Sequence, residues 1–168
     1  MCHRPVRASA AGLVLNSVNT LATPPNLYLV VGYDGSAPAT RALDAAVRLL
    51  HGREGRIDVV YVAHMPGVDM MSADAVAEEQ VTFDDIERDL RVSAAEQLRD
   101  REERWQFERR SGLIADQLLA AAKSLHEAHP DDTVSVVVGS SSQALHRMLG
   151  SAAVSLARHS PVPVVIVP

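Results

Sequence analysis

The sequence predicts an α/β domain built on a parallel β-sheet with helices on both faces. Short runs of valine, leucine and isoleucine, typical of strands buried on both faces, alternate with segments of helical periodicity. Hydrophobic residues make up 47% of the chain and aromatic residues only 4%, so alanine, valine and leucine must fill the core. This composition favours helices packed on a sheet over an aromatic-rich β-sandwich.

The first strand and helix are marked by clear boundary residues. Leu27–Gly32 is an apolar strand that ends in a turn of small and polar residues. Ser36 can cap the helix that follows, and Pro38 lies in its first turn, where a missing N–H costs nothing. Gly52 ends this helix, and Ile57–Ala63 is predicted to be the second strand.

The middle of the chain is predicted to be a long loop followed by a charged helix. His64–Thr82 has no firm periodicity and is predicted to be the loop. Asp84–Arg104 is predicted to be the helix, because acidic and basic side chains alternate at helical spacing. Its buried face is expected to consist of Ile86, Leu90, Ala94 and Leu98. The charges are interpreted as a solvated face, with an interaction surface as the alternative.

The second half of the chain continues the alternation of strands and helices. The predicted elements are a strand at Trp105–Arg110, a helix at Leu113–His126, a strand at Val134–Val138, a helix at Ala144–His159 and a strand at Val162–Val167. The order of elements predicts right-handed crossovers and hence a parallel sheet.

Length and charge limit the possible organisation and partners. The 168 residues suit one domain, predicted to span residues 26–168 after a flexible N-terminal extension, residues 1–25. A net charge of −5 disfavours nucleic acid as a partner, and no apolar run approaches the ~20 residues of a membrane span. The single cysteine, Cys2, cannot form an internal disulfide, which is consistent with a cytoplasmic protein.

A small-residue loop follows the fourth predicted strand. Gly139 ends the apolar run, and the next residues are serines that precede the helix predicted from Ala144. A strand that ends in such a turn at a helix N-terminus offers free backbone N–H groups to an anion. The alternative is that the serine hydroxyls only cap the helix.

Four segments together resemble the universal stress protein family. They are VVGYDGS at Val30–Ser36, VVYVAH at Val59–His64, VVVGSSS at Val136–Ser142 and LGSAAVSLARHSPVPVVIVP at Leu149–Pro168. The resemblance implies a three-layer, Rossmann-like (flavodoxin-like) sandwich with five parallel strands in the order 3-2-1-4-5. It places the loops after the first and fourth strands side by side, where ligands of such sheets bind.

The resemblance also implies a binding site for ATP or another adenine nucleotide. Asp34 stands where the family contacts the adenosine part, Val62 stands at the adenine edge, and Gly32 lies near them. The implied phosphate loop comprises Gly139, Ser140, Ser142, Gly150 and Ser151.

This phosphate loop departs from the family's nucleotide-binding motif. Ser142 replaces the second glycine, and residues 143–149 form a spacer two residues shorter than the family's. A side chain at position 142 hinders close backbone approach to a phosphate. The residues therefore leave two alternatives open, an adenine nucleotide or a nucleotide-free protein-interaction module.

The implied function is a cytoplasmic stress-response protein that binds or regulates, rather than an enzyme. The loop has no lysine and no acidic pair for Mg²⁺, and GSSS lacks the serine-hydrolase elbow, so a weak ATP hydrolase is the least favoured reading. No metal site is expected, because His126 and His129 have no further ligand at suitable spacing. The family pairs subunits through the final strand, which implies a homodimer through Val162–Val167.

Overall fold

The computed structural model describes residues 24–63, 73–99, 104–140 and 151–168. Its strands are β1 (Leu27–Gly32), β2 (Gly55–Ala63), β3 (Trp105–Ser111), β4 (Thr133–Gly139) and β5 (Val164–Val167). They form one five-stranded sheet in the order β3-β2-β1-β4-β5, with every pair parallel. The predicted fold and strand order are confirmed.

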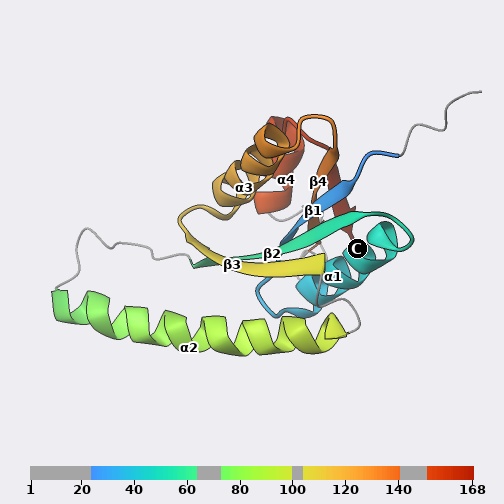
Figure 1. Cartoon of the computed structure of the whole chain (residues 1–168). Coiled ribbons are helices and arrows are strands. Elements are labelled where there is room, and N and C mark those ends of the chain that lie inside the picture. The colour runs from blue at the N-terminus through green and yellow to red at the C-terminus, as the bar shows by residue number, and fades with distance from the viewer. Residues whose placement is uncertain (1–23, 64–72, 100–103, 141–150) are drawn as a thin grey trace, which may run out of the picture.

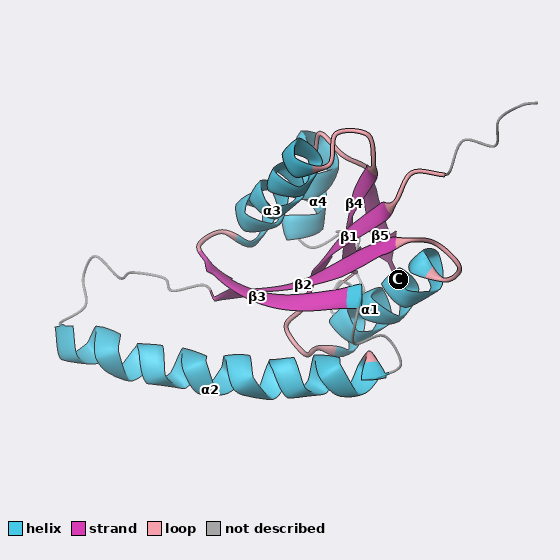
Figure 2. Ribbon diagram, viewed as in Figure 1, coloured by secondary structure: helices cyan, strands magenta, loops and turns pink. Residues whose placement is uncertain are grey.

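The helices cover the sheet in two layers, as Figure 1 shows. They are α1 (Ala37–Leu50), α2 (Ala73–Gln97), α3 (Ile114–Ala128) and α4 (Ser151–His159). Helices α1 and α2 lie on one face and α3 and α4 on the other (Figure 2). This division follows from right-handed crossovers, because the chain moves outward in one direction through β2 and β3 and in the other through β4 and β5.

Two separate cores fill the spaces between these layers. One core joins alternate residues of β1 and β2 to the buried face of α1 and the C-terminal part of α2. The other joins the opposite faces of the same strands and β4 to α3 and α4. Val30 and Val31, neighbours in β1, are both fully buried but belong to different cores, as expected of a central strand.

The prediction of a loop over residues 64–82 was wrong from residue 73 onward, because α2 begins at Ala73, and residues 64–72 lie outside the described residues. Residues 73–81 lack proline and glycine and are rich in alanine and glutamate, which favour helix regardless of packing. Figure 1 shows this end of α2 extending beyond the edge of the sheet. A helix that projects in this way needs no regular apolar face, so hydrophobic periodicity could not reveal it.

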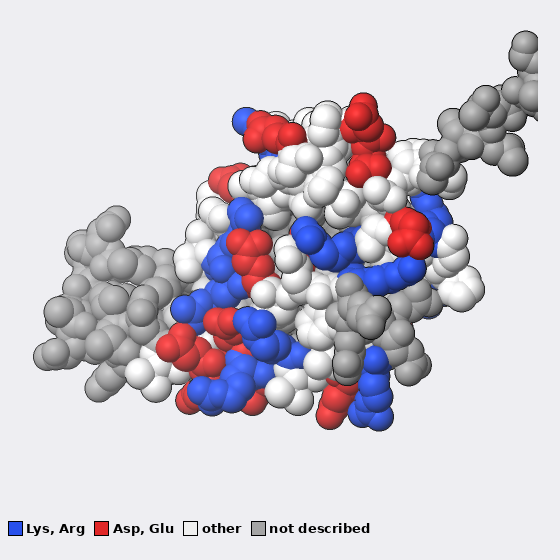
Figure 3. Space-filling view, viewed as in Figure 1, with Lys and Arg blue, Asp and Glu red and all other residues white. Residues whose placement is uncertain are grey.

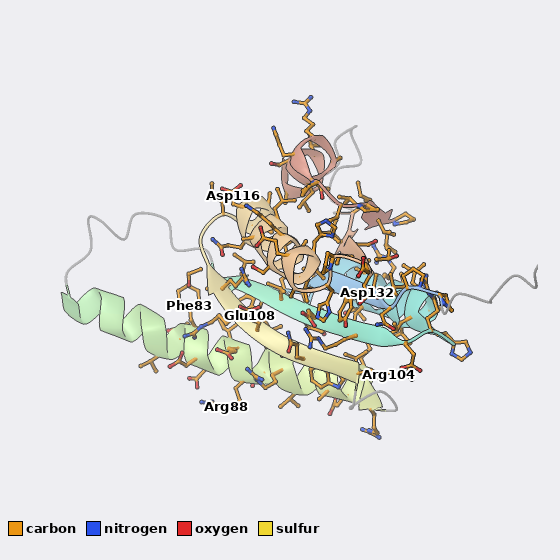
Figure 4. The ribbon with its side chains drawn as sticks, turned by 45° about the horizontal axis from the view of Figure 1, so that its top comes forward. Phe83, Arg88, Arg104, Glu108, Asp116 and Asp132 are labelled. Atoms are coloured by element: carbon orange, nitrogen blue, oxygen red, sulfur yellow. The ribbon has the colours of Figure 1, made fainter. Side chains whose placement is uncertain are left out.

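The predicted buried face of α2 also needs a correction at Ile86, which is 38% exposed. Phe83 and Glu87 turn toward the sheet in its place, and Figure 4 shows Phe83 on the sheet side of α2 and Arg88 on the other. Leu90 and Ala94 do pack on the core as predicted.

The charges of α2 form the solvated face that the sequence predicts. Arg88 pairs with Asp85 at 2.6 Å, at a spacing of three residues, and both side chains are exposed. Figure 3 shows both signs interleaved over this part of the surface. Exposed pairs of this kind contribute little to stability, typically below about 1 kcal/mol.

The charged helix predicted to run to Arg104 ends at Gln97 instead. The other predicted boundaries differ by at most three residues or cannot be compared. The strand predicted from Val162 begins at Val164, although Val136 N–H still donates to the carbonyl of Pro163 at 2.9 Å. The predicted start of the last helix at Ala144 lies outside the described residues. So do residues 1–23 of the predicted extension. Among the described residues, no helix is both long and apolar enough to cross a membrane.

Leu98 provides a test of how α2 is attached to the sheet. Its side chain is fully buried, so Leu98→Ala should leave a cavity and lower the free energy of unfolding by about 2–5 kcal/mol. Val92 lies on the outer face of α2 and is 54% exposed, so Val92→Ala should change it by less than about 0.5 kcal/mol. Urea denaturation of both variants measures the difference, and equal losses would contradict the packing described for α2.

Candidate functional site

Strands β1 and β4 end at the same edge of the sheet, and the helices that follow them lie on opposite faces. Val31 of β1 is paired with Val137 of β4, and Asp34 and Ser140 each lie three residues further along their chains. From there the chain enters α1 on one face of the sheet, whereas α4 lies on the other face. This divergence is the topological switch point at which open α/β sheets bind ligands.

Asp34 combines a structural hydrogen bond with an accessible charge. Its Oδ1 accepts a hydrogen bond from the N–H of Ser36 at 3.0 Å, which closes a turn before α1. Ser36 in turn caps α1, because its hydroxyl accepts from the N–H of Ala39 at 3.3 Å. The Asp34 side chain is exposed, and its Oδ2 makes no hydrogen bond to the part of the chain that the structure describes. That oxygen can accept a hydrogen bond from a ligand.

Gly32 and Val62 lie on the sheet face that α3 covers. A Cβ at Gly32 would lie 3.1 Å from Cδ1 of Leu118 and 3.3 Å from Cγ1 of Val138. Val62 is partly buried against the same core. Both positions are therefore lined by apolar neighbours, which accounts for their residue types without a ligand.

Gly139 is required by the close approach of α1. A Cβ at this position would overlap the carbonyl of Pro38 and lie 2.7 Å from its Cβ. Since the obstacle is largely backbone, it cannot move away as the end of a flexible side chain can. This glycine therefore has a packing role in the first turn of α1.

The backbone N–H of Ser140 is not free for an anion, contrary to what the strand–turn–helix pattern suggested for this loop. It donates to the carbonyl of Val167 in β5 at 2.7 Å. The hydroxyl of Ser140 is the group that remains to bind a ligand. Of the other predicted loop residues, Ser142 and Gly150 lie outside the described residues. Ser151 is the first residue of α4.

A polar cluster that sequence reasoning missed lies beside Asp34, under α2. Burial raises the pKa of the Tyr61 phenol above its ordinary value of 10.0; nearby Arg109 opposes this rise, and Asp34 and Glu87 add to it. Arg109 pairs with Asp84 and, at 3.3 Å, with Glu87, so α2 carboxylates neutralise its charge. The sequence shows only a tyrosine in β2 and an arginine in β3. Tyr61 and Arg109 are neighbours because the two strands pair in this register, which the sequence alone does not reveal.

The two histidines considered for a metal serve other purposes or stand apart. His129 stacks on Tyr28 with ring centroids 4.2 Å apart and an interplanar angle of 18°. His126 is exposed. Within the described ranges, no three histidine, cysteine, aspartate or glutamate side chains gather closely enough to hold a metal ion.

Two glycines at the carboxyl edge should respond differently to an added methyl group. Gly139→Ala should lower the free energy of unfolding by about 1–3 kcal/mol, because Pro38 cannot yield. Gly32→Ala should cost less, because only the tips of Leu118 and Val138 must shift. Thermal or urea unfolding of the two variants compares them. Unchanged stability of Gly139→Ala would show that Gly139 is not needed for packing.

Comparison with known proteins supports the fold and establishes the family. Over 84–86% of its length the chain resembles three solved structures. A protein of the universal stress protein family from Burkholderia pseudomallei has 23% sequence identity, a TM-score of 0.58 and 95% of its own chain covered, and the universal stress protein UspA from Lactobacillus plantarum has 19% identity, a TM-score of 0.61 and 99% coverage. A universal stress protein in complex with cAMP has 22% identity, a TM-score of 0.56 and 98% coverage. No curated protein sequence matches this chain.

At these identities the structural likeness shows the fold alone. The sequence profile described as "Universal stress protein family" matches residues 28–168, which include all five strands. The chain belongs to the universal stress protein family.

Proposed function

We propose that this protein is a cytoplasmic, non-catalytic stress-response protein that binds an adenine nucleotide at the edge between the β1 and β4 loops. The family assignment supports the stress-response role. The structure in complex with cAMP, to which this chain is similar, supports an adenine nucleotide as the ligand class. Within the site the proposal rests chiefly on one observation, the exposed Asp34 carboxylate at the switch point.

The chemistry of the edge fits a nucleoside better than a free phosphate. Oδ2 of Asp34 can accept a hydrogen bond from a ribose hydroxyl or from the adenine amino group. The hydroxyl of Ser140 and the residues at Ser142, Gly150 and Ser151 would then meet the phosphates, helped by the N-terminus of α4. Gly32 and Val62 would contribute apolar surface on the neighbouring strands.

Titration calorimetry with ATP on wild type and Asp34→Asn tests the nucleotide site. Asparagine keeps the Oδ1 acceptor that closes the turn with Ser36, so the variant removes the negative charge but preserves the conformation of the turn. A hydrogen bond to a charged group contributes about 1.5–3 kcal/mol, so the ATP affinity should fall about 10- to 100-fold. Asp131→Asn is the matched control, because Asp131 is also exposed but lies before β4, at the opposite end of the strand.

Mass spectrometry of freshly purified, denatured protein gives an independent answer. Release of ATP, AMP or a cyclic nucleotide in stoichiometric amount is expected. The proposal would be overturned if no nucleotide co-purified and ATP binding produced no heat.

The second candidate is a nucleotide-free protein-interaction module. Two observations favour it: Pro38 alone explains Gly139, and β5 already engages the N–H of Ser140. Both remove features that would otherwise point to phosphate binding.

A weak ATP hydrolase is the third and least favoured candidate, and a steady-state ATPase rate above that of Asp34→Asn would support it.

We also propose that two copies pair through β5, by antiparallel addition at its free edge. Val136 N–H donates to Pro163 and Ser140 N–H to Val167, so alternate residues of β5 face β4. The backbone groups of Val164 and Ile166 therefore point outward at the edge of the sheet. An apolar edge strand with unpaired backbone groups invites such pairing, and two-fold symmetry would close it.

Sedimentation velocity of Ile166 variants tests the dimer. Ile166→Pro removes an outward N–H and should give a monomer, whereas Ile166→Ala trims the side chain but keeps the N–H and should remain a dimer. A monomeric wild-type protein, or a dimeric Ile166→Pro variant, would contradict pairing through β5.

A further inference from the structure

The loop that carries Asp34 lies against one face of α2. Three residues of α2 at spacings of three and four contact this loop or the start of α1: Leu90, Ser93 and Gln97. Residues at this spacing lie on one side of a helix. The contacts therefore act together, and they form only when α2 lies against the sheet.

Tyr33, the residue before Asp34, is held at both its backbone and its side chain. Its N–H donates to the carbonyl of Val60 at 2.9 Å, which extends the pairing of β1 with β2. Its phenol is 3% exposed, and its oxygen lies 2.9 Å from the hydroxyl of Ser93. The bond forms only when α2 is docked, and such a neutral hydrogen bond contributes about 0.5–1.5 kcal/mol net, so it favours the docked position of α2.

The residue after Asp34, Gly35, is fixed by its close packing against α2. Gly35 has a φ of +76°, and a Cβ there would lie 2.7 Å from Cδ2 of Leu90. Further along, the amide of Gln97 donates to the carbonyl of Thr40 at 2.8 Å and to Oδ1 of Asp44 at 2.6 Å. Asp34 thus stands between two residues that α2 contacts, while its own carboxylate stays exposed.

We propose that α2 acts as a clamp on the Asp34 loop, with Tyr33 and Ser93 as positioning residues for the nucleotide site. Neither residue needs to touch the ligand. Displacement of α2 releases Tyr33 and Gly35 together, widens the range of positions open to Asp34 and weakens binding. A ligand held by Asp34 favours the docked α2 by the same factor. The link to ligand affinity rests on the proposed nucleotide function; the clamp itself does not.

Hydrogen exchange without any nucleotide tests the clamp directly. The amides of Ser36 and Ala39 report on the loop, because their hydrogen bonds to Asp34 and to the Ser36 hydroxyl form only when the loop is ordered. Ser93→Ala and Tyr33→Phe should each speed their exchange about fivefold, as expected for loss of one neutral hydrogen bond. Ser93→Thr keeps a hydroxyl and should restore slow exchange.

Two comparisons separate the clamp from a general loss of stability. Val92→Ala, on the outer face of α2, should leave both amides unchanged. Amides in α3, on the far side of the sheet, should exchange at the wild-type rate in every variant. Unchanged exchange at Ser36 and Ala39 in both Ser93→Ala and Tyr33→Phe would overturn the clamp.

An ATP titration of the same variants tests the link to the site. Ser93→Ala should weaken ATP binding about fivefold and Ser93→Thr should not. If wild type binds no ATP, the nucleotide proposal fails, and the exchange experiment still decides the clamp. If ATP binds equally to wild type and Ser93→Ala, the positioning role is overturned even though the nucleotide proposal stands.

Discussion

The structure depends above all on β1 being buried on both faces and bonded along both edges. Val30 and Val31 are each 0% exposed and face different cores, and β2 and β4 pair with β1 on its two sides. Because β1 occupies the centre, the chain must leave it on one face while β4 continues on the other. The switch point at the carboxyl edge is a consequence of that constraint, which also places Gly32, Asp34 and Gly139 there.

The same edge shows why a glycine that matches a family motif is a poor guide to ligand chemistry. Gly139 matches the first glycine of the phosphate motif that the family resemblance implies, yet the carbonyl of Pro38 leaves no room for a side chain there. The proline suits the first turn of α1, whose cap is Ser36. Packing of α1 on β4 thus demands the glycine with or without a nucleotide. Asp34 is more informative, because its exposed second oxygen has no structural use among the described residues.

Much of the fold could be predicted because strands buried on both faces need continuous apolar runs, and β1 and β4 have them. Hydrophobic pattern could not supply the strand order, which came from family resemblance. The assignment of Ile86 failed on geometry: each step of four residues rotates about 40° around a helix, so Ile86 and Leu98 are about 120° apart. For the site, the family resemblance pointed to Asp34, but the cluster of Tyr61 and Arg109 could be found only from the register between strands.

The strength of the contacts decides what kind of control α2 can exert. One neutral hydrogen bond between Tyr33 and Ser93 contributes about 1 kcal/mol, or about fivefold in an equilibrium. A switch that inverts a population from 1:99 to 99:1 needs about 5.5 kcal/mol. Loss of this one bond therefore changes affinity modestly rather than turning binding on and off. Stronger coupling would require the contacts of Leu90 and Gln97 to break in the same step, as they would if α2 left the sheet as one rigid body.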